Sequence, residues 1–402
     1  MGHRLKSLPL GRFMGIPVSV GWSVVAAAGV AAFLLARSVL PATEEGLSLK
    51  IRVGLALIAV ALFLGSILAH EFGHALTARR HGISTNSVKL WIFGGVAALS
   101  SSARSPRAEF QIALAGPATN AVLAVIFGGA AAVSSQIEFA PATFLLTGLA
   151  VVNAMLAITN LVPAAPLDGG RILTAIIWRR TGRPEWARLV SARCGILLSG
   201  AVLLFGLVEL FRFDRLSGFY TLAIGLFLGF AARSDLNTAV IRGRLTSVQV
   251  GDVLTPYPAA IHDSLTLNQL LRMCPSTTAN VSLPVQRWSH QTIGYLSTAV
   301  AHTFSDAERT WTTVGQLMTP PEMVPTAWTS EPLLDALERH GTAPGQLLGI
   351  DPKSGLVVGT ATPDQFRHFL LPPGFWGGDS RRLAPSRLRA GTFQVPARLQ
   401  RS

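Results

Sequence analysis

The sequence predicts a polytopic α-helical membrane domain followed by a soluble α+β domain, and three observations lead to this prediction. Half of the 402 residues are hydrophobic and only 14% are charged, whereas roughly a quarter of the residues in a soluble protein are charged. Six apolar segments precede residue 235, each close to the roughly 20 residues needed to cross a bilayer. From about Ser234 the composition changes to short β-branched runs, helical periods and turn residues.

The six apolar segments predict about six transmembrane helices. The first segment follows a basic leader, and its uncharged stretch is longer than the core of a signal peptide, so we expect a retained span rather than a cleaved signal. The expected spans are Ile16–Ala36, Val53–Thr77, Gly116–Ser135, Thr143–Leu161, Cys194–Leu210 and Leu216–Ala232.

The basic residues predict both a class of partner and an orientation. A net charge of +13 is typical of proteins that bind nucleic acid or an anionic membrane surface. The arginines cluster in loops beside apolar segments and are not interleaved with aromatic residues, which predicts the lipid bilayer as partner and no nucleic acid. The leader and the connections after the second and fourth segments are the richest in Lys and Arg. This bias predicts a multi-pass plasma-membrane protein with both termini and the C-terminal domain in the cytoplasm.

The second apolar segment ends in the motif HEFGH, residues 70–74. His70 and His74 are four residues apart and share a helix face, which is the H-E-x-x-H arrangement: two imidazoles bind zinc and Glu71 acts as general base. On a soluble helix such a pattern also arises by chance as surface decoration. Ionisable residues are costly inside a membrane helix and usually mark a functional site there, so we interpret the motif as a metal site.

A catalytic zinc site needs a third protein ligand and an open position. The fourth segment runs into NLVPAAPLDGG, residues 160–170, whose only acid is Asp168. Prolines before this residue interrupt helix geometry, and the two glycines after it allow a tight turn. The alternative is that Asp168 caps a helix starting near Arg171; with the histidine pair present, we interpret it as the third ligand.

Three asparagines near these segments are candidates for contacts with substrate. Asn160 ends the fourth segment and can hydrogen-bond a substrate carbonyl or a developing oxyanion, or else form an interhelical amide bond. Asn153, two turns earlier on the same face, is the rival for either role. Asn120 near the start of the third segment is expected to support the site or to serve packing only.

The C-terminal half contains an internal repeat. Residues 250–271 (VGDVLTPYPAAIHDSLTLNQLL) align with residues 314–337, and each copy ends in a β-like segment, at 292–298 and 356–362. The expected organisation is therefore a membrane domain at 1–235, a linker at 236–247, repeat domains at 248–303 and 314–371, and a disordered basic tail at 372–402.

Taken together, the membrane motifs resemble the site-2 protease family of intramembrane zinc metalloproteases. HEFGH and NLVPAAPLDGG carry the resemblance, supported by LGRFMGIPVSVGWS, FGGVA at 93–97 and AEFQIALAGPATN at 108–120; it spans roughly residues 8–235. It implies one zinc held by His70, His74 and Asp168, with Glu71 as catalytic base and Asn160 as the substrate-orienting residue. It also implies a reentrant β-like segment in which Gly94 and Gly95 lie near substrate.

The repeated half resembles a tandem pair of CBS domains, which often bind adenine nucleotides. The nucleotide signature is incomplete in both copies, where the ribose-binding acid is missing: Gly294, Ser297 and Val300 occupy the first, and Gly359, Thr362 and Gln365 the second. Adenine nucleotide binding therefore stays open beside a structural, dimerising or gating role, and a homodimer through this pair is one expectation.

We expect the chain to hydrolyse peptide bonds in or beside the transmembrane segment of a single-span membrane protein. A substrate strand is expected to pair with the segment at 88–99. The alternative is a CBS-regulated ion or metal transporter whose His/Asp cluster is a transport site. A transporter needs only ligands, whereas a protease also needs Glu71 as a base.

Overall fold

The computed structural model describes residues 7–40, 46–91, 94–256, 260–273, 282–287, 292–340, 347–353 and 357–361. The chain divides into two compact units, residues 1–239 and 240–402. The first contains the apolar helices and a small sheet, and the second contains the repeat. Each unit is described by itself.

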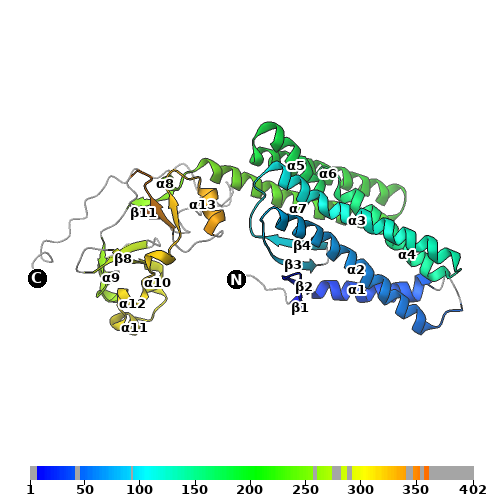
Figure 1. The fold of residues 1–402 in the computed structure, drawn as a ribbon, viewed down its shortest axis with the longest axis horizontal. Coiled ribbons are helices and arrows are strands. Elements are labelled where there is room, and N and C mark those ends of the chain that lie inside the picture. The colour runs from blue at the N-terminus through cyan, green and yellow to red at the C-terminus, as the bar shows by residue number, and fades with distance from the viewer. Residues whose placement is uncertain are drawn as a thin grey trace, which may run out of the picture. The chain divides into compact units, whose positions relative to one another are not determined.

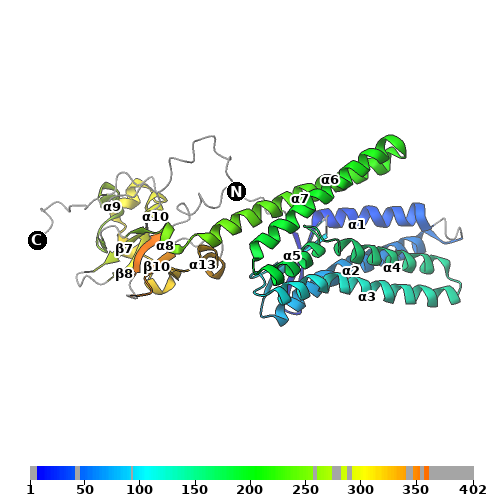
Figure 2. The same cartoon turned by 90° about the horizontal axis from the view of Figure 1, so that it is seen from above.

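Among the described residues, five long apolar helices form most of the first unit (Figures 1 and 2). Their lengths and compositions suffice to cross a membrane. The last five apolar segments expected from the sequence lie within them, apart from Leu161, which follows the last residue of α4. Those helix predictions are confirmed, and each helix begins before its expected apolar segment. The helices are α2 (Leu49–Arg80), α3 (Pro106–Gln136), α4 (Ala140–Asn160), α6 (Pro184–Arg212) and α7 (Arg215–Ser247). A shorter helix, α5 (Asp168–Thr181), connects α4 to α6.

The first expected span, Ile16–Ala36, is wrong at its start. Residues Ile16–Gly21 form strand β2, and helix α1 (Trp22–Leu34) begins only after it and continues into a π-helical turn, η1 (Leu35–Val39). In β2 the side chains of Ile16, Val18 and Val20 are buried. This alternation has the period of a strand with one face on the core. A hydropathy average over this region does not show the alternation, because the residues of β2 and of α1 are both largely apolar.

A four-stranded sheet lies against the C-terminal half of α2. Its order is β1 (Ser7–Phe13), β2, β3 (Thr85–Trp91), β4 (Gly94–Leu99), with only the β2–β3 pair parallel. Ile16, Val18 and Val88 pack on Phe72 and Ala75 of α2. The strand-like character expected at 88–99 is confirmed by β3 and β4, although Phe93 of FGGVA lies outside the described residues. Within this sheet β4 is an edge strand.

Local sequence signals explain where several helices begin and end. Ser48 and Ser105 cap α2 and α3, the latter with its Oγ accepting from the Ala108 N–H at 3.2 Å. Pro106 occupies the first turn of α3, where a missing N–H costs nothing. Gly182 follows α5 with φ +70°, the left-handed conformation that ends many helices.

The second unit consists of two similar halves, each with its own sheet and core. The first sheet has the order β6–β7–β8 and the second β5–β11–β10–β9. Bounds in the first half are α8 (Val250–Val253), β5 (Thr255–Pro256), β6 (Ile261–His262), α9 (Leu267–Met273), β7 (Ser282–Gln286), β8 (Thr292–Ser297), α10 (Thr298–His302) and α11 (Asp306–Trp311). The second half contains α12 (Val314–Leu317), η3 (Pro321–Met323), β9 (Thr326–Trp328), α13 (Leu333–His340), β10 (Leu347–Ile350) and β11 (Val357–Ala361).

The opening turn of each half packs on the other half. The Gly251 N–H donates to the Thr329 carbonyl at 2.9 Å, and the Gly315 N–H donates to the Asp263 carbonyl at 2.8 Å. Val250 of the first half is buried in the core of the second, and Val314 of the second in the core of the first. Because each core needs a residue from the other copy, the repeats form one folding unit.

The structure describes the expected linker but not the expected tail. Residues 236–247, expected as a linker, form the C-terminal part of α7. The expected tail at 372–402 lies outside the described residues, as do Thr362 and Gln365 of the nucleotide signature. Gly294 and Ser297 lie in β8, and Gly359 lies in β11.

Candidate metal centre and active site

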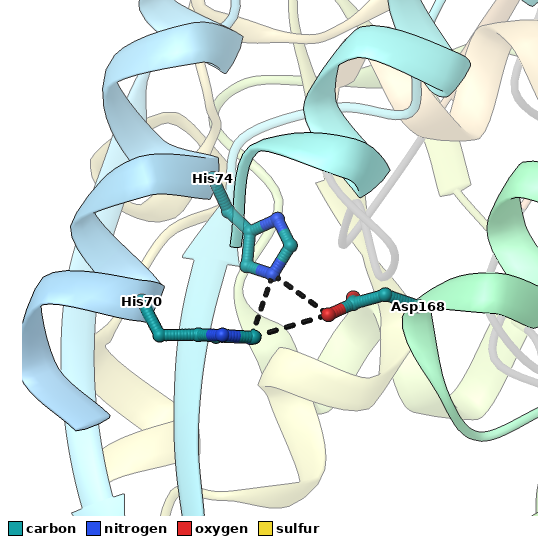
Figure 3. Close-up of side chains that lie close together, drawn as sticks. All are labelled: His70, His74 and Asp168. Carbon is teal, nitrogen blue, oxygen red and sulfur yellow. Dashed lines mark hydrogen bonds and ion pairs between the residues drawn. The ribbon is translucent and has the colours of Figure 1, made fainter. Parts of the chain in front are cut away.

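Three side chains from two helices meet at one point in the first unit. His70 and His74 project from adjacent turns of α2 towards Asp168, the first residue of α5 (Figure 3). The two Nε2 atoms are 3.1 Å apart, and the Asp168 Oδ2 lies 3.1 Å from one and 3.2 Å from the other. Both histidines are buried, at 8% and 6% exposure. The structure thus brings together the three residues expected as metal ligands.

The outer nitrogens of both imidazoles are engaged by α3. The His74 Nδ1 lies 2.6 Å from the Ile112 carbonyl oxygen, which can only accept, so this nitrogen carries the proton. The His70 Nδ1 lies 3.1 Å from the Asn120 Oδ1. Both contacts leave an unprotonated Nε2 facing the carboxylate, which is the tautomer that binds a metal.

The donor set fits zinc. Ligands placed tetrahedrally at roughly 2.0–2.1 Å from the ion lie about 3.3 Å apart, close to the three edges found here. Without a cation, two nitrogen lone pairs and a carboxylate would face one another in a buried space, which is unfavourable. Two imidazoles and one carboxylate also leave a fourth position open, as in catalytic zinc sites.

Asp168 is held by the connection between α4 and α6. Ser191 of α6 donates its Oγ to the Gly170 carbonyl at 2.8 Å and accepts the Ala165 N–H at its own carbonyl. The alternative of a capping role does not apply, because Leu167 is the N-cap and Asp168 already lies in the helix.

Glu71 is buried between α2 and the edge strand β4. A Cβ on Gly95 would lie 2.7 Å from the Glu71 carboxylate carbon, so a larger residue at that position would displace the carboxylate. The carboxylate accepts a hydrogen bond from the Ala97 backbone and lies within electrostatic reach of both histidines. Gly94 has φ +130°, a conformation reserved for glycine. The edge strand therefore lies directly beside the candidate base.

The three asparagines differ in their surroundings. Asn120 is buried and contacts His70 as described. Asn153 is fully buried and donates its amide to the Leu149 carbonyl of its own helix at 2.9 Å. Asn160 is the last residue of α4 and is only half-buried. Of the two rivals for a substrate contact, Asn160 is therefore the accessible one.

Sequence reasoning named Asn120 of α3 but missed Gly116 and Glu109 of the same helix. A Cβ on Gly116 would lie 2.6 Å from the His70 Nε2, so this glycine makes room for the ligand atoms. On the same helix, Glu109 forms an ion pair with Arg171 of α5 at 2.9 Å. The sequence did contain a signal for this ion pair. The acid Glu109 in AEF and the base Arg171 in LDGGR both lie beside the motifs that carry the site.

Comparison with known proteins indicates which protein family the chain belongs to. The model of peptidase family M50 matches residues 58–142 and 129–207. Rip3 of Mycobacterium tuberculosis, named as a zinc metalloprotease, is 33% identical over 89% of this chain and 91% of its own length. The chain belongs to peptidase family M50. This site-2 protease is also similar to MJ0392 of Methanocaldococcus jannaschii, named as a zinc metalloprotease, at 27% identity over 54% of this chain and 60% of that protein.

Two solved structures share a limited similarity with this chain. The site-2 protease of Methanocaldococcus jannaschii covers 57% of this chain and 95% of its own length, with a TM-score of 0.40 and 24% identity. The CBS domain of a bacterial CNNM/CorC family Mg²⁺ transporter covers 37% of this chain and 93% of its own length, with a TM-score of 0.27 and 20% identity.

Family membership establishes the class of enzyme. The chain is a metalloprotease of the site-2 type, and its apolar helices make it a multi-pass membrane protein. This agrees with the enzyme expected from HEFGH and disfavours the transporter alternative. The family implies zinc, and the cluster of His70, His74 and Asp168 is the group of residues that fits it.

Proposed function

We propose that this chain is an intramembrane endopeptidase that cleaves a single-span membrane protein in or beside its transmembrane segment. The observation that carries the proposal is the position of the cluster. His70 and His74 lie on α2 directly after a run of 17 residues, 53–69, that contains no charged side chain. A site at this depth suits a peptide bond at the end of a substrate helix.

The roles of the chain's residues follow from their surroundings. A zinc ion bound by His70, His74 and Asp168 would supply an activated water with a pKa of about 7 and polarise the scissile carbonyl. Glu71 takes the proton from the attacking water and delivers it to the leaving amine. Asn160 donates its amide to the substrate carbonyl as negative charge develops on that oxygen.

We further propose that the substrate pairs with β4 as an added strand. β4 is an edge of its sheet and lies against Glu71. A strand added to a sheet edge lies about 4.8 Å from its neighbour, which brings substrate backbone close to the base. The added strand also unwinds the substrate helix, because an extended backbone cannot keep helical hydrogen bonds.

The test is cleavage of single-span test proteins by the purified full chain in liposomes. Wild type should yield fragments cut near the membrane boundary, and Glu71→Gln, which keeps the shape of the side chain, should yield none. Proline at the alternate positions of β4 whose N–H faces the open edge removes one edge donor at a time and should reduce cleavage at least ~10-fold. Cleavage unaffected by proline at every position would contradict strand pairing, and cleavage by Glu71→Gln would contradict the role of the base.

The orientation and the second unit complete the proposal. We propose that both termini and the CBS-like pair are cytoplasmic in the plasma membrane, supported by the arginine-rich connections. We also propose that the pair forms a homodimer, supported by the large exposed side chains of Trp311 and Met323. Sedimentation of the full chain in detergent should give a dimer that Trp311→Gln dissociates. A monomeric wild type, or a dimer that forms only with adenine nucleotide, would replace this with a structural or nucleotide-dependent role.

A further inference from the structure

A partly buried ion pair links α3 to α5, the helix that carries the candidate ligand Asp168. Glu109 lies in the first turn of α3 and is 7% exposed. Its Oε1 accepts from the Arg171 Nε at 2.9 Å. Arg171 follows Asp168 by three residues, so both side chains project from one face of α5. The guanidinium also interacts electrostatically with Asp168 and Glu71.

Helix α3 contacts both candidate histidine ligands and packs on α5, the helix that carries Asp168. The Ile112 carbonyl accepts from His74, Asn120 contacts His70, and Gly116 makes room for both imidazoles. With Glu109 these positions are spaced by three or four residues and therefore lie on one face of the helix. α5 packs chiefly on α3 and α6. The distance from Asp168 to the histidines of α2 is thus set mainly through α3.

We propose that the Glu109–Arg171 pair is a positioning pair that fixes Asp168 against His70 and His74 by locking α5 onto α3. The inference rests on the proposed zinc site and adds to it the residues that set its geometry. Removing the Arg171 guanidinium leaves the buried Glu109 carboxylate uncompensated. Removing Glu109 releases the partly exposed Arg171 side chain from α3, so either change loosens the contact between α3 and α5. Functional constellations tolerate displacements of only about 0.5 Å, and Asp168 is one turn away from the pair.

The experiment measures zinc affinity of the full chain in detergent by competition with a chromophoric chelator. The variants are Glu109→Gln, Arg171→Gln, their combination and Arg171→Lys. Each single glutamine variant should bind zinc about 10-fold more weakly, as expected when residues that support ligands are lost. The double variant should be no weaker than either single one, because both remove the same interaction. Arg171→Lys keeps the charge and should recover part of the affinity.

Arg188→Gln is the matched control. It breaks the ion pair of Arg188 with Glu185, which lies within α6 and has similar burial but joins no second helix. This variant should bind zinc as wild type does. The absorption spectrum of the Co²⁺-substituted chain gives a second readout, because it reports ligand geometry and should change in the pair variants but not in the control.

A purely structural ion pair would give a different result. The unfolding temperature would fall in the Glu109 and Arg171 variants while zinc affinity and the Co²⁺ spectrum stayed at wild-type values, and that result would overturn the inference alone. Additive losses in the double variant would overturn it as well. A wild-type chain that takes up no zinc after metal repletion would overturn the proposed zinc site and this inference with it.

Discussion

Substitution of Gly116 by alanine adds a single methyl group directly beside the candidate ligand atoms of His70 and His74. The added methyl would lie 2.6 Å from the His70 Nε2 and also 2.6 Å from the His74 Cε1. These separations fall short of ordinary van der Waals contact, which begins at 3.4 Å, by about 0.8 Å. The imidazoles or the α3 backbone must move by at least that amount, because the His74 Nε2 would lie closer still to the added methyl. Metal sites are defined to about ±0.2 Å in their ligand distances.

We therefore expect Gly116→Ala to weaken zinc binding by at least ~100-fold, which is about 2.8 kcal/mol. Chelator competition on detergent-purified protein measures the effect. Gly129→Ala is the control, because it lies on the same helix with no atom within 4 Å of the added Cβ, and alanine favours a helix over glycine by up to about 1 kcal/mol. Gly116→Ala with the zinc affinity of wild type would refute the placement of the ligand atoms beside α3.

Four further predictions address other parts of the chain. Gly195→Ala places a methyl 2.9 Å from the Ala232 Cβ and against the Ala165 carbonyl, so it should displace the connection that bears Asp168 and lower zinc content measured by elemental analysis. Asn120→Ala removes the partner of the His70 ring and should cost about 10–100-fold in zinc affinity, with less effect for Asn120→Asp, which keeps an acceptor. Leu333→Ala empties a fully buried position in the second unit; it should destabilise that unit by about 2–5 kcal/mol in denaturant titrations and leave zinc content unchanged. Hydrogen bonds from the Ser305 side chain and backbone lower the pKa of Glu308 below its ordinary 4.5. The contribution of Glu308 to stability is therefore present above pH 4.5 and is lost as the pH falls through the lowered value. Glu308→Gln should reduce the acid sensitivity of unfolding, and an unchanged pH profile would count against the capping box.

Local patterns in the sequence were enough to predict that His70, His74 and Asp168 lie together. His70 and His74 are one helical turn apart, so their convergence follows from helix periodicity alone. Asp168 was the only acid in the irregular stretch after the fourth apolar segment. The long helices were predictable for a similar reason, because a bilayer requires continuous apolar runs.

The missed features depend on contacts between distant segments. Glu109 and Arg171 are 62 residues apart, and which charges pair depends on how α3 packs against α5. The role of Gly116 appears only when the α2 and α3 backbones are placed side by side. Strand β2 was missed because its alternation of Ile16, Val18 and Val20 merges with the apolar residues of α1 in a hydropathy average.

Zinc content per chain tests the central claim most directly, measured on full-length protein purified in detergent and repleted with metal. Wild type and Glu71→Gln should each hold about one zinc, because Glu71 is a base and not a ligand, and Asp168→Ala should hold far less. Equal zinc in Asp168→Ala and wild type, or none in wild type, would contradict the assignment of these three residues as the catalytic metal site.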